Sequence, residues 1–259
     1  MRAVAAGLTD IGRERSHNED RYIVVPELHL YVVADGMGGH QSGEVASKLA
    51  ASTIASYFKN GDAAKSRRTP LDRLRSAVAT ANAKIYARAD DERAYRGMGT
   101  TVVAAVFSAA ESMIHIGHAG DSRCYLIRGG RITQLTRDHS LVADALLERP
   151  DLTENDLAYL PRNVITRALG MGPTVDVDMR SERTEVGDVF LLCSDGLHGL
   201  VPDEEIIEIV RKNQDLTQAC ARLIERANMH GGRDNITAVL VRIEDGDEPA
   251  RRTRTRTRH

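Results

Sequence analysis

The chain has 259 residues, of which 42% are hydrophobic and 28% are charged, so it can bury a large core made mainly of Val, Ile, Leu and Ala. Its net charge is −2, but five arginines lie in the last nine residues, and the rest of the chain has 30 basic and 37 acidic residues. This acidic body favours cation binding over nucleic-acid binding. Because no apolar run approaches the ~20 residues of a membrane span and the three cysteines are scattered, we expect a cytoplasmic protein with no membrane partner.

The N-terminal part of the chain begins with strand patterns and then changes to a helical period. We expect strands at Ala3–Leu8, Arg21–Val25 and Leu28–Ala34, followed by a helix at Gly43–Phe58. A second helix is predicted to begin after Thr69. Thr69 is a suitable N-cap because Pro70 takes the first helical position and Asp72 lies three residues after the cap.

Strand patterns return in the second half of the chain, where they are separated by hairpin-length gaps. The predicted strands are Thr100–Phe107, Met113–His118, Arg123–Ile127, Arg131–Leu135, Val175–Met179, Val189–Cys193 and Ile236–Ile243. Helices are expected at Asp203–Lys212 and Thr217–Met229, and about Ser140–Pro161 is polar and irregular with short helix signals. Strands grouped apart from helices favour antiparallel sheets with helices packed outside them. Residues 246–259, which include the Arg-Thr repeat, are expected to form a disordered basic tail.

Acidic residues recur where predicted strands begin or end. They are Glu19, Asp20, Asp35, Asp121, Asp195 and Asp234. A single Asp-Gly pair is better explained as turn chemistry. Several such acids in one chain suggest convergence, and converging carboxylates need a cation because they repel one another. Oxygen ligands without paired His or Cys select a hard ion, Mg²⁺ or Mn²⁺, over Zn²⁺.

The segment from Asp35 to His40 lies between a strand and a helix, as a nucleotide-binding loop would. It lacks the Lys-Ser/Thr of a P-loop and the GxGxxG spacing, so its glycines indicate a close approach of the backbone to a ligand. The carbonyl of Gly36 could itself bind a hard ion. Arg15 could bind two phosphate oxygens, although its spacing is equally consistent with a surface arginine.

Seven short segments together resemble the metal-dependent protein phosphatase family (the type 2C family), especially its bacterial, single-domain members. In chain order they are Arg15–Asp20, Asp35–His40, Gly97–Thr101, Gly120–Arg123, Asp138–Ser140, Ser194–Leu197 and Arg233–Thr237. The resemblance implies an α+β fold, a four-layer α/β/β/α sandwich of two antiparallel sheets with helices packed on both outer faces. It also implies a single phosphatase domain at residues 1–245, with a flap at about 140–172.

The same resemblance implies a set of metal ligands. Asp35 would bridge two Mg²⁺ or Mn²⁺ ions at the catalytic centre, and the Gly36 carbonyl would bind one of them. Asp195 and Asp234 would bind the other ion. Asp121, together with Asp195, would hold a third and weaker ion.

Further roles follow from the resemblance for residues around these ligands. Glu19 and Asp20 would support the site through metal-bound water, and Arg15 would hold the substrate phosphate. Some family members have a catalytic His where this chain has Met37. His40 is therefore a possible general acid, and a metal-bound water is the default.

The implied function is hydrolysis of phosphoserine and phosphothreonine by water that two metal ions activate. The expected partners are phosphorylated proteins, namely the targets of a Ser/Thr kinase and the kinase itself, and the chain is expected to be a monomer. One alternative is a catalytically weak, phosphoprotein-binding regulatory module of the same fold, which would be expected to lack metal-binding Asp residues. Nucleic-acid binding through Arg251–His259 would be an accessory role at most.

Overall fold

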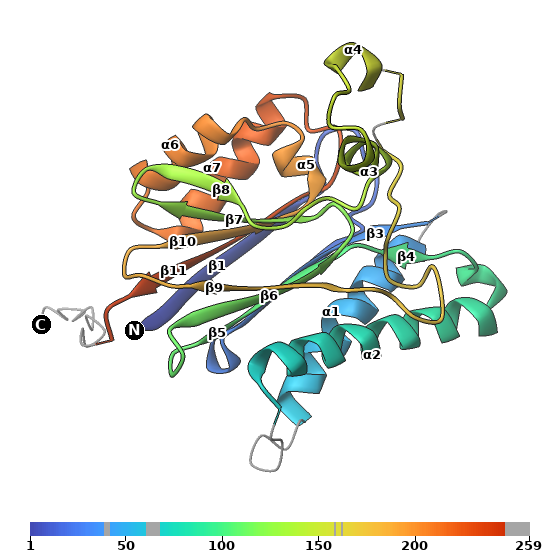
Figure 1. Ribbon diagram of the computed structural model, residues 1–259, viewed down its shortest axis with the longest axis horizontal. Helices are drawn as coiled ribbons and strands as arrows, with labels where there is room; N and C mark the ends of the chain where they lie inside the picture. The colour runs from blue at the N-terminus through green and yellow to red at the C-terminus, as the bar shows by residue number, and fades with distance from the viewer. Residues whose placement is uncertain (39–41, 61–67, 158, 162, 247–259) are drawn as a thin grey trace, which may run out of the picture.

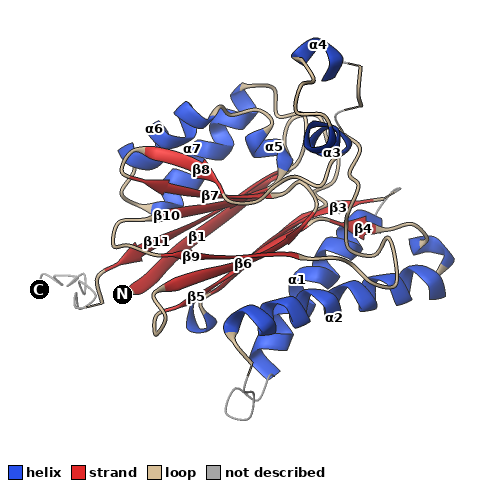
Figure 2. Cartoon of the chain, viewed as in Figure 1, coloured by secondary structure: helices blue, strands red, loops and turns tan. Residues whose placement is uncertain are grey.

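The computed structural model describes residues 1–38, 42–60, 68–157, 159–161 and 163–246. Two antiparallel β-sheets lie face to face at its centre (Figures 1 and 2). The five-stranded sheet has the order β1 (Arg2–Asp10), β11 (Ile236–Glu244), β10 (Val189–Cys193), β7 (Arg123–Arg128) and β8 (Arg131–Gln134). The six-stranded sheet has the order β2 (Asp20–Val25), β3 (Leu30–Met37), β5 (Val102–Ser108), β6 (Met113–Ala119) and β9 (Asp178–Arg183), with β4 (Gly99–Thr100) paired to β3.

Helices cover the outer face of each sheet (Figure 1). The six-stranded sheet is covered by α1 (Ser42–Asn60) and α2 (Pro70–Asp91), and the five-stranded sheet by α5 (Asp195–His198), α6 (Asp203–Lys212) and α7 (Leu216–Met229). Between β8 and β9 the chain forms an excursion that contains α3 (Leu141–Glu148) and α4 (Glu154–Leu157). Single 3₁₀ turns lie at Pro26–Leu28 and Arg93–Tyr95.

The core consists of three apolar layers, which follow from the alternation of side chains along the strands. On β3, Val32 packs in the layer with α1 and α2, whereas Val33 packs in the layer between the two sheets. On β11, Val239 packs between the sheets and Leu240 packs in the layer with α6 and α7. Two sheets with three apolar layers confirm the predicted α/β/β/α sandwich.

Most elements lie where the sequence predicted them, with one clear error. Thr69 caps α2, and its hydroxyl accepts a hydrogen bond from the Asp72 N–H, as expected. The strand predicted at Val175–Met179 exists but was placed too early, because β9 pairs with β6 only over Asp178–Arg183 and shares just Asp178 and Met179 with the predicted range. Val175 and Val177 have strand-forming side chains, but they are half-buried against the α1–α2 layer without strand pairing.

Two further expectations concern the C-terminal tail and membrane-spanning helices. Residues 247–259 lie outside the described part of the chain, so the expected disorder of the tail stays a prediction. Among the described residues, no helix combines the length and the apolar character that crossing a lipid bilayer requires.

Candidate metal centre

Asp20 lies where the two sheets meet. It is fully buried and lies opposite Asp35 in the register between β2 and β3. Its Oδ2 accepts hydrogen bonds from two residues of the other sheet, at 2.7 Å from the Ser194 hydroxyl and 2.6 Å from the Thr237 hydroxyl. This carboxylate therefore joins the six-stranded sheet to the ends of β10 and β11.

Two glycines bring further acids to the same place. Gly196 packs so closely on the Asn235 backbone that a Cβ atom would overlap it, so Asp195 at the start of α5 can approach Asp234. Gly36 packs equally closely on the backbone of Gly43, at the N-terminal end of α1. Any side chain at either position would push these segments apart.

The predicted ligands influence one another electrostatically. Burial, followed by the charges of Asp20, Asp195, Asp121 and Asp234, raises the pKa of Asp35 well above its usual range. Burial raises the pKa of Asp20 to about 7 against the opposing effect of its two hydroxyl donors. Burial and the charge of Asp234 raise the pKa of Asp195. The structure thus brings together all five predicted aspartates.

Carboxylate oxygens without partners show what this cluster lacks. Four such oxygens are buried with no hydrogen-bond partner among the described residues: Glu19 Oε1, Asp20 Oδ1, Asp121 Oδ1 and Asp195 Oδ1. A buried acceptor without a donor is costly, and several in one cluster favour a cation that would bind them and offset their charges. The donor set consists of oxygen atoms, which suits Mg²⁺ or Mn²⁺, and it therefore fits the predicted ions.

Arg15 lies at the edge of this cluster. Its Nη2 donates to Asp234 Oδ2 at 2.6 Å, and its side chain is 51% exposed. Arg15 and Glu19 line a cavity of about 740 Å³, together with Tyr95 and other residues. The guanidinium is therefore both fixed by a predicted metal ligand and accessible to a ligand in the cavity.

Asp121 lies on the other side of the centre. With Asp195 it lines a second cavity, of about 620 Å³, which extends to Val142 of α3 and Leu157 of α4. Burial, with the charges of Asp195 and Asp138, raises the pKa of Asp121 to about 7. The excursion between β8 and β9 therefore borders the predicted site of the third ion. His40, the possible general acid, lies outside the described residues.

Several supporting residues were quoted in the sequence motifs without a role. Asn235 accepts from the Glu19 N–H at 2.8 Å and donates to the carbonyls of Ile11 and His17. Thr101 bonds to the Asp35 backbone twice: its N–H donates to the Asp35 carbonyl at 2.9 Å, and its hydroxyl accepts from the Asp35 N–H at 3.1 Å. The same hydroxyl shares a hydrogen bond with the Ser122 hydroxyl. The signal that could have found Asn235 is its place directly after Asp234, whereas nothing beside Asp35 in the sequence points to Thr101.

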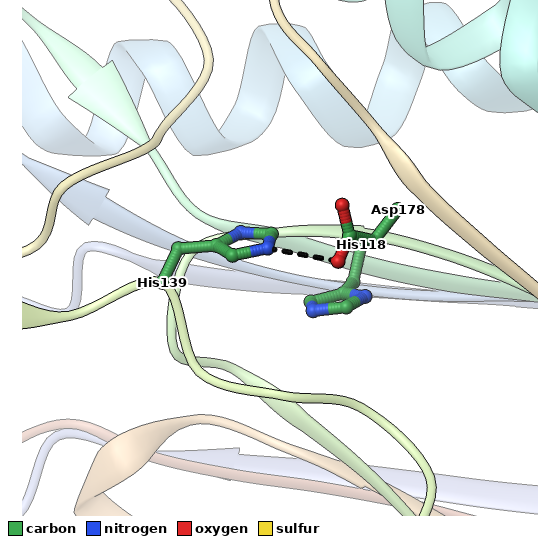
Figure 3. Close-up of side chains that lie close together, drawn as sticks. All are labelled: His118, His139 and Asp178. Carbon is green, nitrogen blue, oxygen red and sulfur yellow. Dashed lines mark ion pairs between the residues drawn. The ribbon is translucent and has the colours of Figure 1, made fainter. Parts of the chain in front are cut away.

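A separate group of polar side chains, formed by His118, His139 and Asp178, lies near the start of this excursion (Figure 3). Their ligand atoms lie within 4.8 Å of one another. His139 Nδ1 accepts from the Gly120 N–H, and its Nε2 lies 3.2 Å from Asp178 Oδ2 and 2.9 Å from Arg167 Nη1. Arg167 donates to Asp178 at 2.7 Å. A metal here would compete with a guanidinium that contacts both His139 and Asp178, so the bonds favour a structural network.

Comparisons with known proteins agree with this geometry. A sequence model of the family described as Protein phosphatase 2C matches residues 12–241. The serine/threonine phosphatase stp of Listeria monocytogenes is 40% identical over 237 residues, covering 90% of this chain and 93% of that protein. Protein phosphatase PhpP of Streptococcus pneumoniae is 35% identical and covers 93% of this chain and 97% of its own.

Solved structures extend the similarity to three dimensions. The Mycobacterium tuberculosis serine/threonine phosphatase PstP/Ppp superposes with a TM-score of 0.84 and 35% identity, covering 95% of this chain and all of the other. The catalytic domain of PstP in complex with two manganese ions superposes with a TM-score of 0.81 and 34% identity, covering 94% of this chain and 99% of the other. With the family match over most of its length, the chain belongs to the protein phosphatase 2C family.

Proposed function

We infer that this chain is a metal-dependent protein phosphatase that hydrolyses phosphoserine and phosphothreonine with a pair of Mg²⁺ or Mn²⁺ ions. The observation that carries this function is the convergence of buried aspartates with unpartnered oxygens where the two sheets meet. Relatives named as serine/threonine phosphatases, and the related PstP structure with two manganese ions, support the reaction and the cofactor. Proteins phosphorylated by a Ser/Thr kinase, and the kinase itself, are the proposed partners.

The residues of the cluster have distinct proposed roles in holding the ions. Asp35 lies at the centre of the mutual repulsion and is the proposed bridging ligand, with the Gly36 carbonyl beside it. Asp195 and Asp234 are the proposed ligands of the second ion. Asp121, which faces the second cavity with Asp195, is the proposed ligand of the weaker third ion. When bound, hard ions supply positive charge and lower the pKa of a coordinated water.

Other residues orient and support these groups. Asp20 holds the seam between the sheets through its two hydroxyl partners, and Glu19, which has one buried oxygen without a hydrogen-bond partner, would support the metals through bound water. Arg15 is the proposed phosphate ligand: Asp234 fixes its guanidinium, and its remaining N–H groups can donate to phosphate oxygens. As the phosphate changes geometry, this positive charge would stabilise the negative charge that builds up on its oxygens.

The domain assignment is part of the same proposal. Residues 1–245 form one phosphatase domain, and residues of about 140–172 form a flap beside the centre. The cavity shared by Asp121, Val142 and Leu157 supports this place for the flap. We also propose that the chain acts in the cytoplasm as a monomer.

The decisive experiment measures phosphate release from a phosphothreonine peptide. The purified chain should release phosphate with Mn²⁺ and stop when EDTA is in excess. Asp35→Asn should abolish release, whereas Asp91→Asn, an exposed change at the end of α2, should not. Peptide binding without release in the unaltered chain would instead favour the regulatory module, and full release in EDTA would refute the metal mechanism.

A further inference from the structure

Two loops are joined at one rim of the metal centre. The N–H groups of Arg13 and Glu14, in the loop before β2, both donate to the carbonyl of Gly232, in the loop before β11, at 2.7 Å and 3.3 Å. Gly232 has a φ of +53°, and a Cβ atom there would lie 2.8 Å from Arg13 Cγ. The glycine thus allows the Arg13 side chain to lie directly against the segment that leads to Asp234.

This rim carries arginines with different partners. Arg15 is bound to Asp234 at 2.6 Å. Arg13 and Arg233 are both exposed, and neither forms an ion pair with a carboxylate in the described part of the chain. The Arg233 stem lies 3.7 Å from the position of a Cβ atom on Gly231, in the same turn. Glu14 and Asp10 carry opposing charges nearby, and Asp10 Oδ1 already accepts from the Gly12 N–H and the Asn228 side chain. Arg13 and Arg233 are therefore cations of this rim that a further anion could pair with.

The spacing of these charges relates them to the substrate. Arg13 precedes Arg15 by two residues, and Arg233 directly precedes Asp234. Residues two positions apart in a chain lie at most ~7 Å from each other along the backbone, and this limit holds both for Arg13 and Arg15 and for two residues of a substrate peptide. We propose that Arg13 and Arg233 bind a second anionic group, a carboxylate or a phosphate, on a residue up to two positions from the phosphorylated one.

This inference rests on the proposed function, because Arg15 is what places the phosphorylated residue. It adds a preference for acidic or multiply phosphorylated segments. The effect should be moderate, since exposed ion pairs are weak and screened by salt. Two arginines acting on one anion should raise kcat/KM on the order of three- to tenfold at low salt, and this gain should shrink as ionic strength rises.

The test compares phosphothreonine peptides of equal length with Mn²⁺ present. The neighbouring positions, two before and two after the phosphothreonine, carry Ala, Glu, Lys or a non-hydrolysable phosphonate. We expect Glu or phosphonate at one of these positions to raise kcat/KM over Ala, and Lys to lower it. The Glu and phosphonate arms distinguish a carboxylate ligand from a second phosphate.

Variants assign the effect to the rim. The double change Arg13→Ala with Arg233→Ala should remove the preference for anionic neighbours. Arg131→Ala removes an exposed arginine at the β7–β8 turn and should leave the preference intact. Hydrolysis of p-nitrophenyl phosphate, which has no second anion, reports separately on the metal centre.

The outcomes separate this inference from the proposed function. Equal kcat/KM values for Ala and anionic peptides with the unaltered chain at low salt would overturn the inference. A preference that persists undiminished in the double variant would also overturn it, because the anion would then bind elsewhere. If the unaltered chain with Mn²⁺ hydrolysed neither the peptides nor p-nitrophenyl phosphate, the phosphatase function itself would fail.

Discussion

Replacing Asp121 with asparagine should stabilise this protein when divalent cations are absent. Burial and the charges of Asp195 and Asp138 raise the pKa of Asp121 from 3.8 to about 7. Between these values the folded state binds more protons than the unfolded state, so stability falls as pH rises through this range and the loss is complete above pH ~7. The difference of about three pKa units, each worth about 1.4 kcal/mol, corresponds to about 4 kcal/mol.

The pH dependence makes this prediction specific. At pH ~5 the unfavourable contribution of Asp121 should be about 2 kcal/mol, and at pH ~8 about 4 kcal/mol. Asparagine has no charge to bury. The gain in unfolding free energy of Asp121→Asn over the unaltered chain should therefore double between these pH values.

The gain in unfolding free energy is measured by urea unfolding in excess EDTA at both pH values, with circular dichroism as the signal. Asp91→Asn, on the exposed end of α2, serves as the control and should show no such pH-dependent gain. Adding Mn²⁺ should stabilise the unaltered chain more than Asp121→Asn, since the variant lacks a proposed ligand of the third ion. A gain of equal size at both pH values would refute the reasoning.

The other predictions concern turnover, phosphate binding and acid stability. Asp234→Asn should lower kcat by orders of magnitude, measured by phosphate release with saturating Mn²⁺. Arg15→Ala should lower kcat/KM for phosphopeptides by a factor that corresponds to about 1.5–3 kcal/mol of lost transition-state stabilisation, and Arg15→Lys should lose only part of this. Unaltered kinetics would show that Arg15 is a surface arginine with no role in phosphate binding. Burial, then the charge of Arg123, lowers the pKa of His198 to about 4, so the folded state binds fewer protons. The contribution of His198 to the unfolding free energy should fall by about 3 kcal/mol as pH drops from 6.5 to 4. Urea unfolding should therefore show that the unaltered chain loses about this much stability relative to His198→Gln over the same pH range.

The sequence was sufficient for the parts of the fold that depend on local pattern. Uninterrupted apolar runs of strand length located the central strands, and the Thr69 cap located the start of α2. Acids at strand ends predicted a cluster because antiparallel strands from two facing sheets can end at one place. The error at Val175–Met179 arose because β-branched residues favour strands wherever they are half-buried, whether or not a partner strand is present.

The contacts that complete the site are not local and could not be read from pattern. The hydroxyls of Ser194 and Thr237 reach Asp20 from the other sheet, across 174 and 217 positions of sequence. Arg15 and Asp234, which form the 2.6 Å ion pair, are 219 positions apart. Such pairs follow from the order in which strands assemble, which no single segment of sequence specifies.

The position of the acids also explains how cofactor binding and folding become coupled. Asp20 lies in the seam between the sheets with one oxygen satisfied by hydroxyls and the other without a partner. The neighbouring Asp35 and Asp195 have raised pKa values, because burial and the repulsion between the carboxylates both oppose ionisation. Cations that offset these charges lower the free energy of the folded state only, since the unfolded chain holds no such cluster. The seam that would hold the proposed metal ions is therefore also a part of the sandwich whose stability should depend on those ions.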